Sequence, residues 1–405
     1  MRGASPAEAS NALSVWDADN HLYEAVDAYT RHLDPKYRGG IQFVEVDGRT
    51  KLMVKGRLTD TIPNPTYEVV PTPGAWSDYF KGINPEGKSL RELAQPIRCP
   101  DEFREPSARL ELLDRQQVDG CVLFPTTGGM LEERMLDDIE LTAAVVHAFN
   151  RWLLEDWTFD YQGRIVSTPM INLADVDAAV AELDWVLDHG ARCVLVNPRP
   201  VATPSGHTTS IAGTQFDPFW AAVSRAGVPV LMHACDSGYD RYTRDWEGAG
   251  AEYLPFQPDT FRTVLYEDAR SIFDTCAALI CHGVFDRHPG VRVGVVENGG
   301  SWVPRLLETL ERVQKKMPSE FPTDPVQLFR DHIWVNPFHE DDMSGLVDLI
   351  GADRVMFGSD FPHPEGLADP AVYAAELDPL GPETAARIMG RNLLDLLERR
   401  PTAGV

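Results

Sequence analysis

The sequence predicts an α/β protein, a (β/α)8 barrel of the TIM type with an inserted hairpin and cap region after its first strand. Eight short apolar segments recur along the 405 residues, each followed by a helical segment or a helical insertion. The segments are continuously apolar, which is typical of parallel strands covered on both faces. Eight such units favour a closed barrel over an open sheet, and no GxGxxG motif follows the first strand.

The first strand and the segment after it set the organisation of the chain. The run VWDADNH at 15–21 is the first predicted strand. Residues 40–100 then hold IQFVEV, DG and RTKLMV, which predict a hairpin, followed by a proline-rich stretch. We expect this insertion to cap a site rather than to fold separately, so residues 1–405 are predicted to be one domain.

From residue 107 onward, helices and strands alternate regularly. Ser107 is expected to cap the first of these helices, Gly190 to end the third, and Pro382 to begin the last. Strands are predicted at 118–126, 164–171, 191–198, 228–235, 291–298, 332–337 and 353–360, and helices at 107–118, 131–160, 175–190, 217–226, 268–285, 302–316, 341–350 and 382–399.

Composition excludes several classes of protein. The net charge of −25 leaves no basic face for nucleic acid and disfavours anionic membranes. No run of 18 apolar residues predicts a transmembrane helix, and the first residues lack an apolar signal core. None of the six cysteines shows CxxC spacing, and Cys121 and Cys193 lie in apolar runs, so both are expected to be reduced and buried. We therefore expect a cytoplasmic protein that acts on a small molecule.

Side chains suited to metal binding end four of the predicted strands, at the face where barrel enzymes place their active sites. Asp19 and His21 are two residues apart on strand one, so their side chains leave the same face. His233, Glu297 and Asp360 end strands five, six and eight. A single such residue has a structural explanation, as a helix cap or a core histidine. Four strand ends together indicate a catalytic site for a divalent metal.

Four motifs then identify a family. DADNH, VLMHA, GVFDRHPGVRVGVVENGGSWVPRLLE and FGSDFPHPEG occur in this order, and the similarity spans residues 14–396. The chain resembles the amidohydrolase superfamily, in the branch that contains aminocarboxymuconate semialdehyde decarboxylase and the resorcylate decarboxylases. The resemblance implies that Asp19 and His21 occupy the two ligand positions of strand one and His233 that of strand five. It also implies that Asp360 contacts a metal-bound water, and that the protein is a homodimer.

The sequence departs from that branch at strand six. Its decarboxylases carry a histidine in an AHGG motif, which acts there as general acid or base; this chain has Glu297 in VENGG. An acidic residue is a good metal ligand, and with Asp19 it favours iron, with manganese or zinc as alternatives, at one or two ions per chain. The superfamily includes a diiron dehydratase of diterpenoid biosynthesis, which such a centre would suit. Strand four offers Asn197 and no lysine to carry a bridging carboxylate.

Further candidates surround these ligands. Glu24 follows His21 in the first loop, and His363 follows Asp360 and would hold a ligand in place. His282, in the helix before strand six, is a further candidate ligand. Tyr239, Arg199 and Trp302 are expected to shape the substrate pocket, whereas His339 and Glu340 are assigned to the start of a helix.

We expect a metal-dependent lyase that eliminates water or carbon dioxide from a sizeable apolar substrate, with dehydration favoured because of Glu297. The expected catalytic residues are Asp360, Glu297, Glu24 and His363. Aromatic and apolar residues of the insertion and of the loop at 236–260 suggest the apolar substrate. Two alternatives stay open: a metal-dependent hydrolase of an ester, lactone or amide, and a non-catalytic binding barrel.

Overall fold

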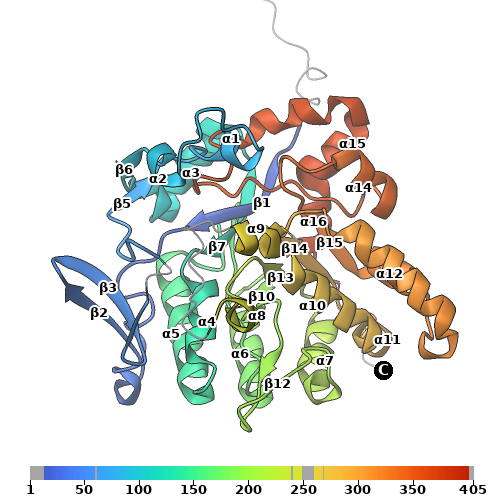
Figure 1. Ribbon diagram of the computed structural model, residues 1–405, viewed down its shortest axis with the longest axis horizontal. Helices are drawn as coiled ribbons and strands as arrows, with labels where there is room; N and C mark the ends of the chain where they lie inside the picture. Colours follow the sequence, from blue (N-terminus) through green and yellow to red (C-terminus); the bar gives the residue numbers. More distant parts are fainter. Residues whose placement is uncertain (1–12, 60–61, 239, 249–259, 268, 401–405) are drawn as a thin grey trace, which may run out of the picture.

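A ring of parallel strands enclosed by helices forms the centre of the structure (Figure 1). The computed structural model describes residues 13–59, 62–238, 240–248, 260–267 and 269–400. Two four-stranded sheets, ordered β1-β7-β9-β8 and β10-β13-β14-β15, provide the strands, and β8 pairs antiparallel with β9. They are β1 (Trp16–Leu22), β7 (Gly120–Pro125), β8 (Asp160–Tyr161), β9 (Ile165–Ser167), β10 (Val194–Leu195), β13 (Val230–His233), β14 (Val293–Val296) and β15 (Ile333–Val335).

Isolated parallel bridges close the two sheets into one barrel. The segment 353–361 takes the place of the eighth strand, between β15 and β1. It is held by single contacts, such as the 2.9 Å bond from the Ala18 N–H to the Phe357 carbonyl, rather than by a regular ladder. The predicted barrel is therefore confirmed. The bridging pairs are Met170–Leu195, Val335–Val355 and Asn20–Phe361.

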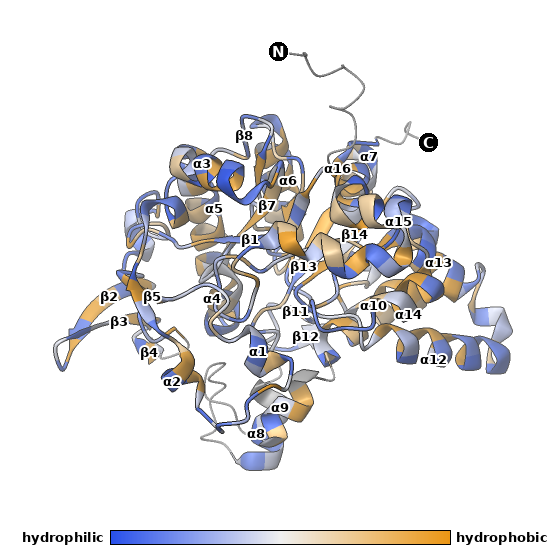
Figure 2. Ribbon diagram, turned by 90° about the horizontal axis from the view of Figure 1, so that it is seen from above, coloured by the Kyte–Doolittle hydropathy of each residue, from blue (hydrophilic) through white to orange (hydrophobic). Residues whose placement is uncertain are grey.

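The continuous apolar runs account for these strands. All six residues of β7 and all four residues of β14 are buried, as expected when both faces of a parallel sheet are covered. Seen from above, β7, β13 and β14 lie inside a surround of helices that includes α3, α6 and α13 (Figure 2). The apolar strands thus supply the core, and the residues just beyond their carboxyl ends are free to carry chemistry.

The insertion contains the predicted hairpin. β2 (Ile41–Val46) and β3 (Arg49–Val54) are joined by Asp47 and Gly48, both with positive φ (51° and 72°), as a two-residue type I′ turn requires. The hairpin lies at the edge of the molecule (Figure 1). The later part of the insertion instead reaches the loop after Asp360, because the Trp76 N–H donates to the Pro364 carbonyl. The remaining elements of the insertion are β4 (Arg57–Thr59), β5 (Val69–Pro71), β6 (Pro96–Arg98), α1 (Ser77–Phe80) and α2 (Leu90–Leu93).

The helices follow the predicted order, but several of their ends differ. Ser107 is not an N-cap: the helix begins at Pro106, whose missing N–H suits the first helical position, and Glu105 precedes it. The helix predicted at 131–160 is two helices, because the Asp138 side chain accepts the Leu141 N–H and starts a new one. The helix predicted at 268–285 is likewise divided, at Gly283 (φ 72°).

The last predicted helix contains a π-helical turn at Arg387–Arg391. Short 3₁₀ segments lie at Pro35–Tyr37, Asp101–Phe103, Thr214–Phe216, Pro318–Glu320 and Pro370–Leu380. A small pair of strands, β11 (Val201–Ala202) and β12 (Thr208–Thr209), follows β10. The helices outside the insertion are α3 (Pro106–Gln116), α4 (Gly128–Met135), α5 (Ile139–Asp156), α6 (Val176–Asp188), α7 (Asp217–Ala226), α8 (Asp240–Glu247), α9 (Thr260–Glu267), α10 (Arg270–Cys281), α11 (Val284–Arg287), α12 (Val303–Lys316), α13 (Pro325–His332), α14 (Met343–Ile350), α15 (Pro382–Ala386) and α16 (Asn392–Leu397).

Two expectations from composition can be compared with this structure. Within the described residues, no helix is both long and apolar enough to cross a membrane. Cys121 and Cys193 are free thiols and fully buried, as predicted from the apolar runs that contain them.

Candidate metal centre

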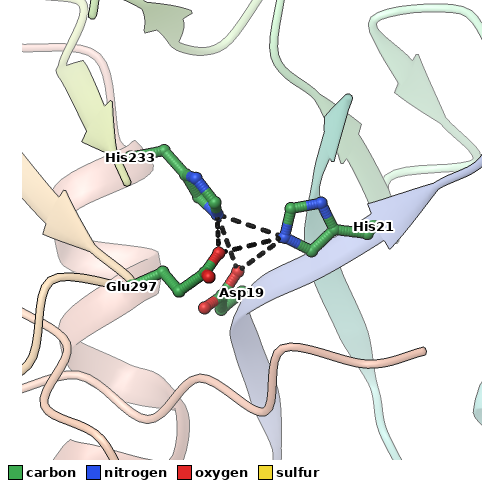
Figure 3. Close-up of side chains that lie close together, drawn as sticks. All are labelled: Asp19, His21, His233 and Glu297. Carbon is green, nitrogen blue, oxygen red and sulfur yellow. Dashed lines mark hydrogen bonds and ion pairs between the residues drawn. The ribbon is translucent and has the colours of Figure 1, made fainter. Parts of the chain in front are cut away.

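Four side chains from three strands converge on one point at the carboxyl ends of the barrel strands (Figure 3). Asp19 and His21 belong to β1, His233 ends β13, and Glu297 follows β14. One ligand atom from each lies within 4.8 Å of all the others. The His233 Nε2 atom is 2.8 Å from the Glu297 Oε2 atom and 3.1 Å from the His21 Nε2 atom. The predicted convergence of these four residues is present in the structure.

A second group overlaps the first. His21, Glu297, Asp360 and His363 also place one ligand atom each within 4.8 Å of the others. The His21 Nε2 atom is 3.4 Å from Asp360 Oδ1, and the His363 Nδ1 atom is 2.6 Å from the same oxygen. Because His21 and Glu297 belong to both groups, the arrangement offers donors for one cation or for two adjacent ones.

The donor set fits a divalent transition metal. Two imidazole nitrogens face each other with carboxylate oxygens beside them, which is the mixture of ligands used by iron, manganese and zinc. Burial disfavours protonation of His233, but the carboxylates of Glu297 and Asp19 outweigh it and raise its pKa to about 10. Burial and the Glu297 charge raise the pKa of Asp360 well above its usual range. Three crowded carboxylates therefore call for positive charge at this point, and a divalent cation would supply it.

Two of the acidic residues sit on backbone of unusual conformation. Glu297 has φ 51° and Asp360 has φ 56°, the left-handed region that side chains other than glycine seldom adopt. Such a conformation costs on the order of 1–3 kcal/mol and is retained mainly at functional sites. The Asp360 N–H donates to the Asp19 carbonyl at 2.9 Å, so the bend that places Asp360 is itself tied to strand one.

A buried carboxylate behind the centre joins the first strand to the last. Asp17 is fully buried and accepts hydrogen bonds from the Ser359 N–H (2.9 Å) and the Ser359 hydroxyl (2.5 Å). It also accepts the Asn20 amide at 2.8 Å and the Asp19 N–H at 3.1 Å. Burial raises the pKa of Asp17 to about 6 in spite of these donors. Asp19 lies two residues after Asp17, and Asp360 directly follows Ser359. The contact between Asp17 and Ser359 therefore positions two of the candidate ligands.

A buried arginine completes this support. Arg109, from α3, is fully buried, and its guanidinium donates to the Asn20 side-chain oxygen and, at 2.7 Å, to the His21 carbonyl. The Asn20 side chain therefore bridges the Arg109 cation and the Asp17 anion, which lie on either side of it. The backbone of His21 is held from behind by the same guanidinium.

A cavity of about 270 Å³ opens beside the centre. Asp19, Glu297 and Asp360 form part of its wall, and α1 contributes Phe80. The first turn of α10, including Arg270, also contributes to the wall. Polar residues from several loops complete the lining, among them Ser237, Asn298, His339 and Glu365. The cavity can therefore hold a small molecule with one end on the candidate ligands.

Glu24 lies in a different environment from the one predicted. It is buried, and its Oε1 atom accepts the Tyr29 hydroxyl (2.7 Å) and the backbone N–H groups of Thr127 (2.7 Å) and Gly128 (3.2 Å). These contacts hold the start of α4 rather than the cation site, and Glu24 belongs to neither ligand group among the described residues. Its proposed catalytic role stays a prediction.

Of the other secondary candidates in the described residues, the structure places one at the centre and the rest elsewhere. His363 contacts Asp360 as expected and also lies 3.1 Å from the Thr126 hydroxyl. The structure does not bring His282 to the centre: α10 ends there, the side chain is exposed, and its Nδ1 lies 2.8 Å from the Ser210 hydroxyl. Arg199 and Trp302 are buried in polar contacts with Glu133 and Gly299, and neither forms part of the described lining of the cavity. Tyr239 lies outside the described residues.

Several residues that line the cavity were not assigned to it from the sequence, among them His339, Glu340 and Glu365. His339 and Glu340 were assigned to a helix start, yet α14 begins only at Met343, and both line the cavity. Glu365 also lines it, and burial together with the Glu297 charge raises the pKa of Glu365 to about 8. Its position in FPHPEG, close after Asp360, was the available signal.

Comparisons with known proteins show the family of the chain. A family model described as amidohydrolase matches residues 17–398. A gamma-resorcylate decarboxylase of Rhodococcus jostii is 26% identical over 268 residues, which cover 63% of this chain and 76% of that protein. A 2-amino-3-carboxymuconate-6-semialdehyde decarboxylase of Dictyostelium discoideum is 28% identical over 330 residues, covering 78% and 81% of the two chains.

Solved structures show the same barrel. The structure of an amidohydrolase from Mycobacterium avium subsp. paratuberculosis is 41% identical, has a TM-score of 0.90, and covers 96% of this chain and 98% of its own. A dihydroxybenzoic acid decarboxylase from Polaromonas, solved with bound manganese, is 17% identical with a TM-score of 0.55, covering 80% and 93% of the two chains. At that identity, the second likeness shows the fold alone.

The Asp17 contact leads to a prediction about stability. Asp17→Asn replaces an acceptor of four hydrogen bonds with a group that must turn an NH₂ towards one of the donors. We expect the free energy of unfolding in urea to fall by about 2–3 kcal/mol. Asp114→Asn, which alters an exposed carboxylate paired with Arg164, is the matched control and should change it by less than about 0.5 kcal/mol. Equal stability of the two variants would contradict the role assigned to Asp17.

Glu24 allows a second prediction. Glu24→Gln keeps the oxygen that accepts the two N–H groups and the hydroxyl, so we expect its metal content to equal that of the natural protein and its stability to fall by less than about 1 kcal/mol. Glu24→Ala removes the acceptor and should cost about 2–3 kcal/mol. A Glu24→Gln variant that folds as well as the natural protein but binds no metal would place Glu24 in the centre instead.

Proposed function

The chain belongs to the amidohydrolase family, and from this premise we propose that it is a metal-dependent lyase that decarboxylates a small aromatic acid. The observation that carries the proposal is the convergence of Asp19, His21, His233 and Glu297 beside a cavity of about 270 Å³. The curated relatives named above, both decarboxylases of carboxylated substrates, support the reaction type.

The residues of the centre would hold a cation, and residues of the cavity wall would keep water away from it. When bound, a divalent cation supplies a Lewis acid that polarises a substrate carboxylate or hydroxyl oxygen. His21, His233, Asp19 and Glu297 would hold it, and His363 orients Asp360 through the 2.6 Å contact between Nδ1 and Oδ1. Phe80 and the loop that carries His339 would exclude water from the cavity that these residues share.

Dehydration is the second candidate, and Glu297 is the observation that favours it. Contacts with His233 and His21 lower the pKa of Glu297 in spite of its burial, so its carboxylate is ionised and suits metal binding better than proton donation. The histidine that resorcylate-type decarboxylases use at this position is therefore replaced by a ligand rather than by another acid. A two-metal centre, with iron favoured, would then serve loss of a hydroxyl group.

Metal content tests the centre directly. In protein purified without added metal, elemental analysis should find one or two divalent ions per chain, with iron as the favoured metal. His233→Ala should reduce the content at least tenfold, and Glu297→Ala should remove one ion if two are present. His282→Ala, which removes an exposed histidine away from the centre, is the matched control and should retain the full content. Full metal content in His233→Ala would refute the centre.

Product analysis separates the reactions. With 2,6-dihydroxybenzoate labelled with ¹³C in the carboxyl group, a decarboxylase releases labelled carbon dioxide. Dehydration of a hydroxylated alicyclic acid would give an alkene, and hydrolysis of its lactone in ¹⁸O-water would place the label in the new carboxylate. We expect carbon dioxide release that Asp360→Asn reduces at least 100-fold. Label incorporation without carbon dioxide would favour the hydrolase, and no turnover across a panel of aromatic acids would count against decarboxylation.

A further inference from the structure

The hydrogen bonds of His363 lead away from the metal centre to a threonine on a neighbouring strand. Thr126 directly follows β7, and its hydroxyl oxygen lies 3.1 Å from the His363 Nε2 atom. The other ring nitrogen, Nδ1, lies 2.6 Å from the Asp360 Oδ1 atom. Among the described residues, Thr126 belongs to neither candidate ligand group. One imidazole therefore links Asp360 to a side chain that the centre itself does not use.

The strand register brings Thr126 to this position. β1 and β7 are parallel neighbours, and Leu22 is paired with Pro125. Thr126 is the next residue, so it lies at the carboxyl ends of both strands. Its hydroxyl donates to the Leu22 carbonyl at 2.8 Å. The end of the first strand thus directs the hydroxyl hydrogen of Thr126, and it does so one residue after His21.

This arrangement assigns the hydrogen on the His363 ring. A hydroxyl group has one hydrogen, and a carbonyl oxygen only accepts, so the bond to Leu22 uses that hydrogen. The Thr126 oxygen then accepts a hydrogen from the His363 Nε2 atom. With an N–H at Nε2, only Nδ1 is able to exchange a hydrogen with the Asp360 carboxyl group. The chain of hydrogen bonds ends at a backbone carbonyl, so no proton passes beyond the ring.

Ring contacts and backbone bonds hold the same orientation of His363. Its ring lies 4.0 Å from the His21 ring, centre to centre, with 31° between the two planes, and 6.0 Å from the Tyr23 ring. Its N–H donates to the Asp360 carbonyl at 2.8 Å, and its carbonyl accepts the Gly74 N–H at 3.2 Å. A half-turn of the imidazole would exchange both nitrogens for carbons and lose both side-chain hydrogen bonds. The observed orientation is therefore the one that Thr126 selects.

We propose that Thr126 is a positioning residue for the proton donor at the end of strand eight. It fixes the orientation and tautomer of His363, and the His363 Nδ1 atom in turn holds the Asp360 carboxyl group. The proposal rests on the proposed function, in which Asp360 transfers the proton. There, the bond between the substrate carbon and its carboxylate breaks, carbon dioxide leaves, and the proton from Asp360 bonds to that carbon in its place.

Kinetics of two substitutions at Thr126 test this role. Thr126→Val keeps the shape and removes the oxygen, whereas Thr126→Ser keeps the hydroxyl. In metal-loaded protein, we expect Thr126→Val to lower kcat for carbon dioxide release about tenfold or more, with KM within about twofold. Thr126→Ser should stay within about threefold of the natural protein. Thr168→Val is the matched control, because the Thr168 hydroxyl also donates to a strand carbonyl, that of Leu123 at 3.0 Å, and should leave kcat unchanged.

A double variant tests whether Thr126 acts through His363. In a His363→Gln background, Thr126→Val should lower kcat by less than about twofold more, because the ring that it positions is already absent. An equal loss in both backgrounds would show that Thr126 only supports the strand ends, and would overturn the proposal. All variants should keep the natural metal content. Loss of an ion in Thr126→Val would make His363 a metal ligand instead, which would also overturn it.

Nuclear magnetic resonance tests the geometry without turnover. The sample is zinc-loaded protein labelled with ¹⁵N in its histidine rings, and the His363 signals are those missing from His363→Gln. We expect a hydrogen on Nε2 in the natural protein and in Thr126→Ser, and its loss or a clear shift in Thr126→Val. A bare Nε2 in the natural protein would overturn the proposal even if the enzyme decarboxylates aromatic acids. A protonated Nε2 without turnover of any aromatic acid would support the role of Thr126 and refute the proposed reaction.

Discussion

The carboxylate of Asp17 is the constraint on which the site depends. A fully buried carboxylate is unfavourable unless donors surround it, and here two N–H groups, a hydroxyl and an amide do so. Two of these donors come from Ser359, in the segment that replaces a regular eighth strand. Barrel closure at this seam has few backbone bonds of its own, so the side-chain contact both completes the ring and holds Asp19 and Asp360 in register.

Positive and negative side chains also compensate each other near this contact between the first strand and the segment 353–361. Arg109 is buried, and its described hydrogen bonds go to Asn20 and to backbone carbonyls rather than to a carboxylate. Asn20 in turn donates to Asp17, so its side chain links the guanidinium to the buried carboxylate. Beyond Asp17, the carboxylates of Asp19, Glu297 and Asp360 crowd two imidazoles. From the barrel wall outward, positive or hydrogen-bond-donating groups therefore alternate with carboxylates. A divalent cation would balance the last group of carboxylates, at the centre itself. The geometry of the centre thus follows from electrostatics that begin in the barrel wall.

Sequence alone was sufficient for the barrel and for the five residues at strand ends, since apolar runs mark where strands stop and parallel strands bring their ends together. It was insufficient where position depends on distant loops. Phe80 reaches the cavity because the insertion is tied to the loop after Asp360, a contact that no periodicity encodes. His339, which follows β15, in turn contacts Ser77 of the insertion at 3.4 Å. Glu24 lies near His21 in sequence, but its side chain is taken by the α4 start instead. Helix ends at Asp138 and Gly283 were missed because single capping residues decide them.

Glu297 stands where the resemblance implies a histidine, and this difference changes which residue can bind metal and which can transfer a proton. The resemblance to the decarboxylases of this branch implies a histidine at this point, which would give and take a proton. Here the carboxylate lies 2.8 Å from His233 and 3.5 Å from His21, between the two imidazoles that the resemblance assigns to the metal. Because these contacts keep its carboxylate ionised, Glu297 suits metal binding better than proton donation. In the proposed function, Asp360, which also lines the cavity and is held by His363, is therefore the group assigned to proton transfer. The proposed function thus places a metal ligand at the end of strand six and the proton donor at the end of strand eight.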